Sequence, residues 1–473
     1  MGNVDAVWEG LIHQYNQKAR PIPFDFKNIV LEDFGERRSN KYPHYIHYYP
    51  GKIFPYIPLF LLSLDELCPP KGIVLDPFSG SGTVLLESII NPVHKRNAWG
   101  VEINPLGRLI SKVKTTPIDI EFTRNILKQI FRYNGSLSNN ISLHIPEFKN
   151  INIWFSEKAI KGLAKTRFLI ENLNAEKDYK DFFWLCFSSI VRKVAKADPF
   201  IPPPVILKPY KYKNNHKRYE YLQKFLKNAE DPDVISLFKD AVENNLKSID
   251  TLNGIWEVSK KKIKVKIIWD DAKDIRFSGL ADRGRIIKNG TIRPLDSNSI
   301  DFIITSPPYL TAQKYIRTHK LELLWLDLLT EKELLGLDKE LIGTEKVSLK
   351  QVDFNKQLGI KSIDRLIKWS ITVSPERAAL VYKYFHDMRQ AISEMYKVLK
   401  NDAYAILVVG NNTVLKKKVE TYRLLTDIAT SVGFREILIL KDDIRVKGMI
   451  TKRHNSGGLI KEEYVIILRK EKS

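Results

Sequence analysis

Cysteine is scarce in this chain: its 473 residues include only Cys68 and Cys186, which lie far apart and show no Cys-x-x-Cys or Cys/His spacing. This pattern excludes a disulfide framework and gives no sign of a structural zinc site, so no metal is expected. Such a composition fits a reducing compartment.

Long hydrophobic runs and targeting signals are missing as well. The longest apolar run, around residues 57–64, is far too short to cross a bilayer. The start MGNVDAVWEG lacks the charged and apolar regions of a signal peptide. The sequence therefore predicts a cytoplasmic protein that makes no use of a membrane.

Negative charge is the third deficit. Asp and Glu number 55 against 76 Lys and Arg, which leaves a formal net charge of +21. A field of this sign favours a polyanionic partner, either nucleic acid or an anionic membrane surface. A lysine-rich surface that serves solubility is the alternative.

The length exceeds what one compact core usually holds. We expect an N-terminal arm with one short helix in residues 1–40 and an α/β unit in residues 41–117 and 259–473. Residues 118–258 show long helical patterns around a proline-rich break. The predicted fold is thus an α/β open sheet with a helical insertion between its second and third strands. Residues 346–375 are polar and weakly patterned, and we expect a loop or lid there.

Residues 71–87 read KGIVLDPFSGSGTVLLE and predict a buried strand, a glycine-rich turn and a helix start. Such a corner binds nucleotide-type ligands at the carboxyl end of a strand. Two residues that the turn lacks narrow the range of ligands that it could bind. Thr83 stands where a P-loop needs Lys, and Leu85 stands where a dinucleotide fingerprint needs its third glycine. S-adenosylmethionine has no phosphates and requires neither feature.

Acidic residues follow at the ends of the next two predicted strands. Glu102 comes after a strand at residues 98–101, at the position and with the chemistry of a ribose-binding acid. Asp271 comes after a strand at residues 265–269, where it could accept a hydrogen bond from an adenine amine. A solvated strand end is the alternative for each acid alone, but the three features in this order favour an adenosine-type ligand.

A second loop, Ser306-Pro307-Pro308-Tyr309, follows a predicted strand at residues 300–304. The exocyclic amine of a base is a poor nucleophile because its lone pair is delocalised into the ring. The Ser306 hydroxyl and the Pro307 carbonyl can accept its protons and aim that lone pair at a methyl donor, and the prolines stiffen the turn. Tyr309 offers a face on which an extruded base can stack. A proline turn that only closes a strand is the alternative.

Methylation of a ring carbon of cytosine would need a thiolate nucleophile. Neither cysteine is placed for it, because Cys68 precedes the glycine turn and Cys186 lies in an apolar predicted helix. Both are better interpreted as core residues.

Two basic segments are predicted to contact nucleic acid. In residues 208–224, Lys and Arg alternate with Tyr, which suits phosphate contacts and base stacking, although a solvated helix face is the alternative. The second segment is a loop that contains Arg445, Lys447, Lys452 and Arg453. Tyr315, Arg317 and Lys320 follow the second loop closely and could contact phosphates or serve the core or surface.

Taken together, these motifs resemble those of the amino-group DNA methyltransferases. The resemblance runs through HYYPGKIFP (47–55), DPFSGSGT (76–83), VEINPLG (101–107), DDA (270–272), NSIDFIITSPPY (298–309) and KEEYVIILRK (461–470). It covers the whole α/β part and implies a Rossmann-like class I methyltransferase fold, S-adenosylmethionine as cofactor and double-stranded DNA as partner.

The resemblance also implies roles for individual residues. Glu102 would bind the ribose and Asp271 would approach the adenine. Ser306, Pro307, Pro308 and Tyr309 would form the catalytic loop. The cofactor site as a whole would comprise Lys52, Asp76, Phe78, Gly80, Ser81, Gly82, Thr83, Glu102, Asp271 and Ala272. The predicted insertion departs from the usual target-recognition position of the family, which leaves open where the DNA sequence is read.

A serine at the first position of the catalytic loop is typical of cytosine-N4 enzymes, whereas Asn or Asp is typical of adenine-N6 enzymes. We therefore expect N4 methylation of a flipped cytosine within a restriction–modification system, by an enzyme associated with the nucleoid and accompanied by a cognate restriction endonuclease. The alternatives are an adenine-N6 DNA methyltransferase, an RNA base-amine methyltransferase and a non-catalytic nucleic-acid binder.

Overall fold

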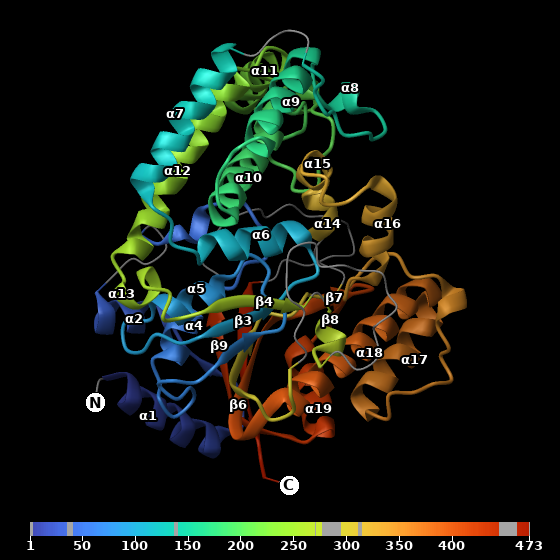
Figure 1. Cartoon of the computed structure of the whole chain (residues 1–473). Helices are drawn as coiled ribbons and strands as arrows, with labels where there is room; N and C mark the ends of the chain where they lie inside the picture. Colours follow the sequence, from blue (N-terminus) through green and yellow to red (C-terminus); the bar gives the residue numbers. More distant parts are fainter. Residues whose placement is uncertain are drawn as a thin grey trace.

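The computed structural model describes residues 3–35, 41–136, 141–269, 271–276, 295–310, 315–443 and 461–472. A mixed α/β part built on one large sheet forms the lower half of Figure 1, and a mostly helical region stands above it. The helical region comes between β3 and β4 in the chain. That this region is an insertion relative to the amino-group DNA methyltransferases, which the sequence resembles, stays a prediction.

The sheet has the strand order β1-β9-β10-β6-β5-β2-β3-β4. All neighbouring pairs are parallel except those of β10, which is antiparallel to β6 and to β9. A short hairpin, β7–β8, lies outside it. The strands are β1 (Ile22–Pro23), β2 (Val74–Asp76), β3 (Ala98–Val101), β4 (Val265–Trp269), β5 (Ile300–Thr305), β6 (Leu399–Gly410), β7 (Asn412–Val414), β8 (Lys417–Val419), β9 (Phe434–Asp443) and β10 (Glu462–Lys470).

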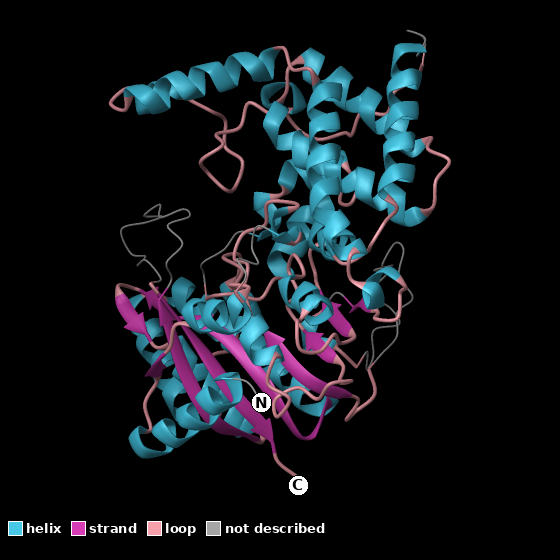
Figure 2. Ribbon diagram, turned by 90° about the vertical axis from the view of Figure 1, so that its left-hand side faces the viewer, coloured by secondary structure: helices cyan, strands magenta, loops and turns pink. Residues whose placement is uncertain are grey.

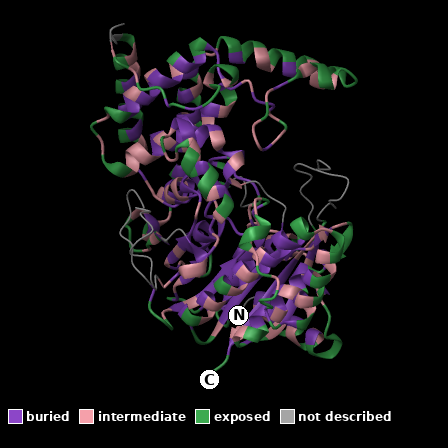
Figure 3. Ribbon diagram, turned by 90° about the vertical axis from the view of Figure 1, so that its right-hand side faces the viewer, coloured by how far each residue is buried: buried purple, intermediate pink, exposed green. Residues whose placement is uncertain are grey.

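Near-continuous apolar runs explain why these segments form central strands. Strands covered on both faces lose the alternation of polar and apolar residues. In β5 and β10 consecutive side chains are buried, as the purple strands of Figure 3 show. Helices accordingly cover both faces of the sheet (Figure 2).

The helices that belong to the α/β part come from both ends of the chain. They are α1 (Asn3–Lys18), α2 (Phe26–Phe34), η1 (Pro43–Tyr45), α4 (Tyr56–Leu62), α5 (Thr83–Ile90), α6 (Pro105–Lys114), η4 (Ala272–Asp274), α14 (Tyr315–Thr318), α15 (Lys320–Trp325), α16 (Glu331–Glu340), η5 (Leu349–Gln351), α17 (Lys361–Val373), α18 (Pro375–Val398) and α19 (Thr421–Val432).

The helical region holds α7 (Ile120–Ser136), α8 (Ile151–Trp154), α9 (Glu157–Glu171), α10 (Lys177–Val191), η2 (Arg192–Val194), η3 (Pro209–Tyr212), α11 (His216–Glu230), α12 (Val234–Asn253) and α13 (Trp256–Ser259). Its apolar core continues into the α/β part, because Leu106 of α6 and Trp325 of α15 belong to the same buried cluster as Phe187 of α10. Burial of shared apolar surface therefore fixes the helical region on α6 and α15.

Two sequence expectations differ from the structure. In its described residues, the N-terminal segment has two helices and an edge strand rather than one short helix, and Trp8, Phe26 and Val30 are buried against the sheet's core. Residues 346–375 are not only loop, since α17 occupies most of their second half. In both cases tertiary burial of a few apolar residues orders a segment whose composition is polar.

Candidate functional site

The site lies where the strand order reverses, between β2 and β5. From β2 the chain continues outward to β3 and β4 on one side, while β5 and β6 lie on the other. Ligands of open α/β sheets bind at the carboxyl ends of the strands at such a switch point. The glycine turn follows β2 and the Ser306 loop follows β5, so topology places both loops at this edge.

Asp76 ties these two strand ends together. Its Oδ1 accepts hydrogen bonds from the Thr305 hydroxyl at 2.5 Å and from the Phe78 amide at 3.1 Å. Burial raises the pKa of the Asp76 carboxyl to about 7, against the opposing effect of these hydrogen bonds. Through these two hydrogen bonds the Asp76 carboxyl holds the start of the glycine turn against the end of β5.

Gly80 and Gly82 have left-handed backbones, with φ of 52° and 73°. A Cβ on Gly80 would come within 3.2 Å of the Tyr49 ring, and one on Gly82 would come within 2.8 Å of the Ser111 hydroxyl. L-residues with side chains rarely adopt this backbone. The sequence Gly-Ser-Gly is therefore needed both for the turn and for the close approach of its neighbours.

Glu102 accepts hydrogen bonds on both carboxylate oxygens. Oε2 accepts from the Gly80 amide at 2.7 Å, and Oε1 accepts from the Asn104 amide at 2.8 Å and from the Tyr49 hydroxyl at 3.3 Å. Burial raises the pKa of Glu102 to about 7. Each carboxylate oxygen has about two lone pairs, so capacity for a ligand hydroxyl remains on Oε2.

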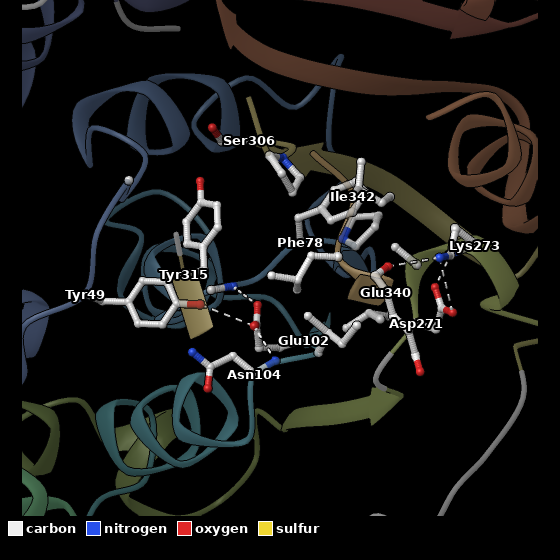
Figure 4. Close-up of a pocket in the computed structure, with 18 residues that line it drawn as sticks. Tyr49, Phe78, Glu102, Asn104, Asp271, Lys273, Ser306, Tyr315, Glu340 and Ile342 are labelled. Atoms are coloured by element: carbon white, nitrogen blue, oxygen red, sulfur yellow. Dashed lines mark hydrogen bonds and ion pairs between the residues drawn. The ribbon is translucent and has the colours of Figure 1, made fainter. Parts of the chain in front are cut away.

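Asp271 lies at the far side of the same cavity, where its Oδ1 accepts from the Lys273 amide at 3.0 Å. Of the residues that line this cavity, Figure 4 shows Ser306 at the top of the view, Glu102 below it and Asp271 at the right. Its lining comprises Tyr49, Gly51, Pro77, Phe78, Gly80, Val101, Glu102, Ile103, Asn104, Asp271, Ala272, Lys273, Ser306, Pro308, Tyr315, Glu340, Leu341 and Ile342.

The Ser306 loop is held by groups from distant parts of the chain. The Tyr384 hydroxyl of α18 donates to the Pro308 carbonyl at 3.0 Å, and the Asn412 side chain donates to the Leu310 carbonyl at 2.9 Å. The Tyr309 hydroxyl donates to Glu463 at 2.8 Å. These contacts fix the backbone of the loop, and Ser306 is part of the cavity lining.

Residues predicted for the site divide into two groups. Phe78, Gly80, Glu102, Asp271, Ala272, Ser306 and Pro308 line the cavity, whereas Lys52, Asp76, Ser81, Gly82, Thr83, Pro307 and Tyr309 lie outside its lining. Several of the second group support the first. Lys52, for example, donates to the carbonyls of His44 at 2.9 Å and His47 at 3.0 Å, and burial lowers the pKa of its ammonium to about 8. Lys52 thereby shapes the backbone that carries Tyr49 and Gly51.

Among the lining residues that sequence reasoning missed are Tyr49, Asn104, Leu341 and Ile342. Asn104 had a visible signal, because an Asn before Pro105 is a helix N-cap, and its side chain accepts from the Leu106 amide at 3.0 Å. Leu341 and Ile342 had none, since they follow α16, far from any motif.

The residues that were predicted to contact phosphates lie in different surroundings. Tyr315 lines the cavity. Arg317 pairs with Asp338 at 2.9 Å and Lys320 pairs with Glu331 at 3.2 Å, so these cations have acidic partners. Lys208, Lys211, Lys213, Lys217 and Lys224 are exposed. The basic loop with Arg445, Lys447, Lys452 and Arg453 lies outside the described residues.

Both cysteines are fully buried, and burial raises the pKa of each thiol to about 12. Within the described part of the chain, no group of three His, Cys, Asp or Glu residues could hold a metal ion. The helices described there include none that is long and apolar enough to cross a membrane.

The fold and the site define an α/β protein with a cavity at the carboxyl ends of its parallel strands, lined by residues of both the glycine turn and the Ser306 loop. Known proteins add to this. No protein-family model matches the chain. It is 26% identical over 417 residues to the Type II methyltransferase M.MvaI of Kocuria varians, which covers 84% of this chain and 82% of that protein.

Two further relatives align with this chain over a comparable number of residues. The Type II methyltransferase M.BsoBI of Geobacillus stearothermophilus is 23% identical over 420 residues, with 80% and 76% covered. M.AvaI of Nostoc sp. is 24% identical over 391 residues, with 78% and 74% covered. The homologues are thus Type II methyltransferases, and they support an enzyme that methylates DNA with S-adenosylmethionine.

A solved structure adds little. A Thermus thermophilus protein described as a DNA modification methylase is 15% identical and aligns over 19% of this chain and 38% of its own. Its TM-score of 0.15 is too low to carry an argument about the fold.

Proposed function

We propose that the chain is a site-specific DNA methyltransferase that transfers a methyl group from S-adenosylmethionine to N4 of a flipped cytosine in double-stranded DNA. The observation that carries this proposal is that Glu102 and Ser306, which lie about two hundred residues apart, face one cavity. The first offers a carboxylate to ribose hydroxyls, and the second offers a hydroxyl acceptor to the amine of a base.

The residues present fit the cofactor. Glu102 keeps acceptor capacity for a ribose, and the backbone of Gly80 borders the cavity without a side chain. Ala272, Ile342 and Phe78 supply apolar surface in the same cavity as Asp271, which suits an adenine ring. When bound, S-adenosylmethionine supplies an electrophilic methyl group.

The Ser306 loop prepares the acceptor. Ser306 faces the cavity, and its hydroxyl oxygen can accept a proton of the exocyclic amine. The Pro308 carbonyl already accepts from Tyr384 at 3.0 Å, which fixes the peptide next to the Pro307 carbonyl. Two oriented acceptors draw the amine toward tetrahedral geometry and expose its lone pair, which is a positioning effect. No general base is required, because the amine loses its proton to water after methylation.

The serine at position 306 favours cytosine N4 over adenine N6, by resemblance to the family. We further propose that the lysine-rich residues 208–224 of the helical region contact DNA and that a cognate restriction endonuclease accompanies the enzyme, as the Type II relatives suggest.

The test is transfer of labelled methyl from S-adenosylmethionine to unmodified DNA, followed by nucleoside analysis and methylation-sensitive sequencing. Label in N4-methylcytosine at one sequence context is the expected result. Label in N6-methyladenine would keep the enzyme class and change the base. Label in 5-methylcytosine, preferential labelling of RNA, or no binding of S-adenosylmethionine in calorimetry would contradict the proposal.

A further inference from the structure

A proline-rich loop of the helical region, residues 197–206, is partly exposed but is held by many hydrogen bonds. We refer to it as the proline loop. An antiparallel bridge between Ala197 and Ile206 closes its base. The Asp198 amide donates to the Val205 carbonyl at 2.9 Å, and the Leu207 amide donates to the Lys196 carbonyl at 2.9 Å. Pro199, Pro202, Pro203 and Pro204 restrict the backbone between these bonds.

Two side chains brace the proline loop from inside. The guanidinium of Arg192 donates to the Asp198 carbonyl at 3.1 Å and also to the carbonyls of Ile201 and Pro202. Asp198 is only 2% exposed. Its carboxylate accepts from the Phe200 amide at 2.9 Å and from the Tyr212 hydroxyl at 2.6 Å. A loop held in this way loses little conformational entropy when it binds a partner.

A third side chain joins the proline loop to α11. The Arg218 guanidinium lies 4.1 Å from the ring centre of Phe200 and 4.2 Å from that of Tyr212, so it is stacked between two aromatic rings. Phe200 is nevertheless 40% exposed, and so is Val205, whose carbonyl accepts from the Asp198 amide at the base of the loop. The proline loop therefore presents a stiff apolar tip to the outside, with Phe200 in the tip and Val205 where the tip joins the base.

The surroundings of this tip are strongly basic. Residues 199–219 contain no Asp or Glu, and Lys208, Lys211, Lys213 and Lys217 are exposed. An apolar tip surrounded by cations suits DNA. The cations can contact the phosphates, and the tip can contact the apolar faces of the stacked bases between the two strands. A protein partner would instead need a matching acidic rim around an apolar recess.

The base of the proline loop connects to the candidate site. The loop leaves α10 through η2, and the Ser188 hydroxyl of α10 is 2.8 Å from Nε2 of His47, in the segment that carries Tyr49. Figure 2 shows the helical region standing over the sheet. The proline loop is thus connected, through η2 and α10, to the segment that carries the cavity residue Tyr49.

We propose that the proline loop is a DNA wedge: Phe200 and Val205 insert into the duplex next to the base that is methylated and occupy stacking space that this base leaves. The inference rests on the proposed function, because extrusion of a base creates the space to be filled. The exposed lysines hold the flanking phosphates while the braced loop keeps the tip from folding back.

The test uses the full chain with the double substitution Phe200→Ala and Val205→Ser. The matched control is Phe122→Ala with Val373→Ser, which removes a Phe and a Val of similar exposure (46% and 53%) elsewhere on the surface. Substrates are a duplex that carries the mapped target and the same duplex with an abasic site opposite the target base, where extrusion needs no unpairing. Methyl transfer and DNA affinity are both measured.

The wedge predicts that the loop variant loses about tenfold or more in methyl transfer on the intact duplex, on the scale of one lost stacking contact. On the abasic duplex it should lose less than about threefold, because the unpaired base needs less help to leave the stack. The control should match the wild type on both. Equal losses on both duplexes, or no loss on either, would overturn the wedge.

A failure of the proposed function gives a different result. If the wild type transfers no methyl group, DNA affinity alone decides about the wedge: the wild type should bind an abasic duplex several-fold more tightly than an intact one. The loop variant should lose this preference and the control should keep it. A variant that keeps the preference would contradict the wedge regardless of catalysis.

Discussion

The glycine turn after β2 and the Ser306 loop after β5 lie side by side at the sheet edge but are stiffened in different ways. In the glycine turn, the constraint is local: left-handed glycines and carboxylates from the adjoining strand ends hold residues 77–82. In the Ser306 loop, the constraint comes from Tyr384, Asn412 and Glu463, which belong to α18, β7 and β10. The two loops therefore respond differently to substitution.

Gly80→Val tests the local constraint and should have the largest effect. A Cβ at Gly80 meets the Tyr49 ring at 3.2 Å and forces a β-branched residue to adopt a φ of 52°. Left-handed backbone costs L-residues about 1–2 kcal/mol, and the side chain also fills the edge of the cavity. We expect loss of S-adenosylmethionine binding in calorimetry, and with it loss of all methyl transfer.

Gly35→Val is the matched control. Its φ of 64° is similarly left-handed, but no atom lies within 4 Å of its Cβ position. It should reduce thermal stability through the same backbone strain and leave cofactor affinity unchanged. Retained cofactor affinity in Gly80→Val would contradict the role of the glycine turn.

Ser306→Ala tests the second loop. In the proposed function the serine offers an acceptor to the amine rather than to the cofactor, so kcat should fall by roughly 10²–10³-fold, as for loss of one oriented group at a reacting centre. The Kd of S-adenosylmethionine should change little. Ser299→Ala, just before the opposite end of β5, is the control and should retain kcat. Equal loss of cofactor affinity in Ser306→Ala and Gly80→Val would refute the division of roles between the loops.

The same contrast explains what could be predicted from the sequence. The strand, glycine turn and helix at residues 74–90 and the acid Glu102 were recognisable because each depends on neighbours in the chain or on the next strand. Tyr384, Leu341 and Ile342 were not, since only the packing of α16 and α18 brings them to the site. The N-terminal helices and α17 were underestimated for a related reason: a few buried residues, such as Trp8 and Ile363, outweigh a polar composition.

The pH dependence of cofactor binding tests the role of Glu102, whose carboxylate holds the glycine turn. Burial raises the pKa of its carboxyl to about 7, so part of the population is protonated at neutral pH. The protonated form lacks one acceptor oxygen for the ribose hydroxyls that we propose Glu102 binds. Affinity for S-adenosylmethionine should therefore rise from pH 6 to pH 8 by up to about tenfold per unit below the pKa, and level off above it. Calorimetry across this range measures it.

Two variants separate Glu102 from its neighbour. Asp76 also has its pKa raised to about 7 by burial, but its side chain lies outside the cavity lining. Asp76→Asn should keep the pH dependence of cofactor affinity, while Glu102→Gln should bind weakly and without this dependence. The reverse pattern would assign the titration to Asp76.

Tyr384→Phe tests the distant support of the Ser306 loop and should have the smallest effect. It removes the hydroxyl that donates to the Pro308 carbonyl at 3.0 Å and keeps the buried ring in place. One such hydrogen bond contributes about 0.5–1.5 kcal/mol, so kcat should fall by roughly threefold to tenfold while the Kd of S-adenosylmethionine stays constant. Tyr382→Phe on the same helix is the control, because its hydroxyl donates to the Lys356 carbonyl at 3.0 Å, outside the loop. If Tyr384→Phe lowers thermal stability as Tyr382→Phe does but leaves kcat unchanged, the Ser306 loop holds its shape through its prolines alone, and its constraint is as local as that of the glycine turn.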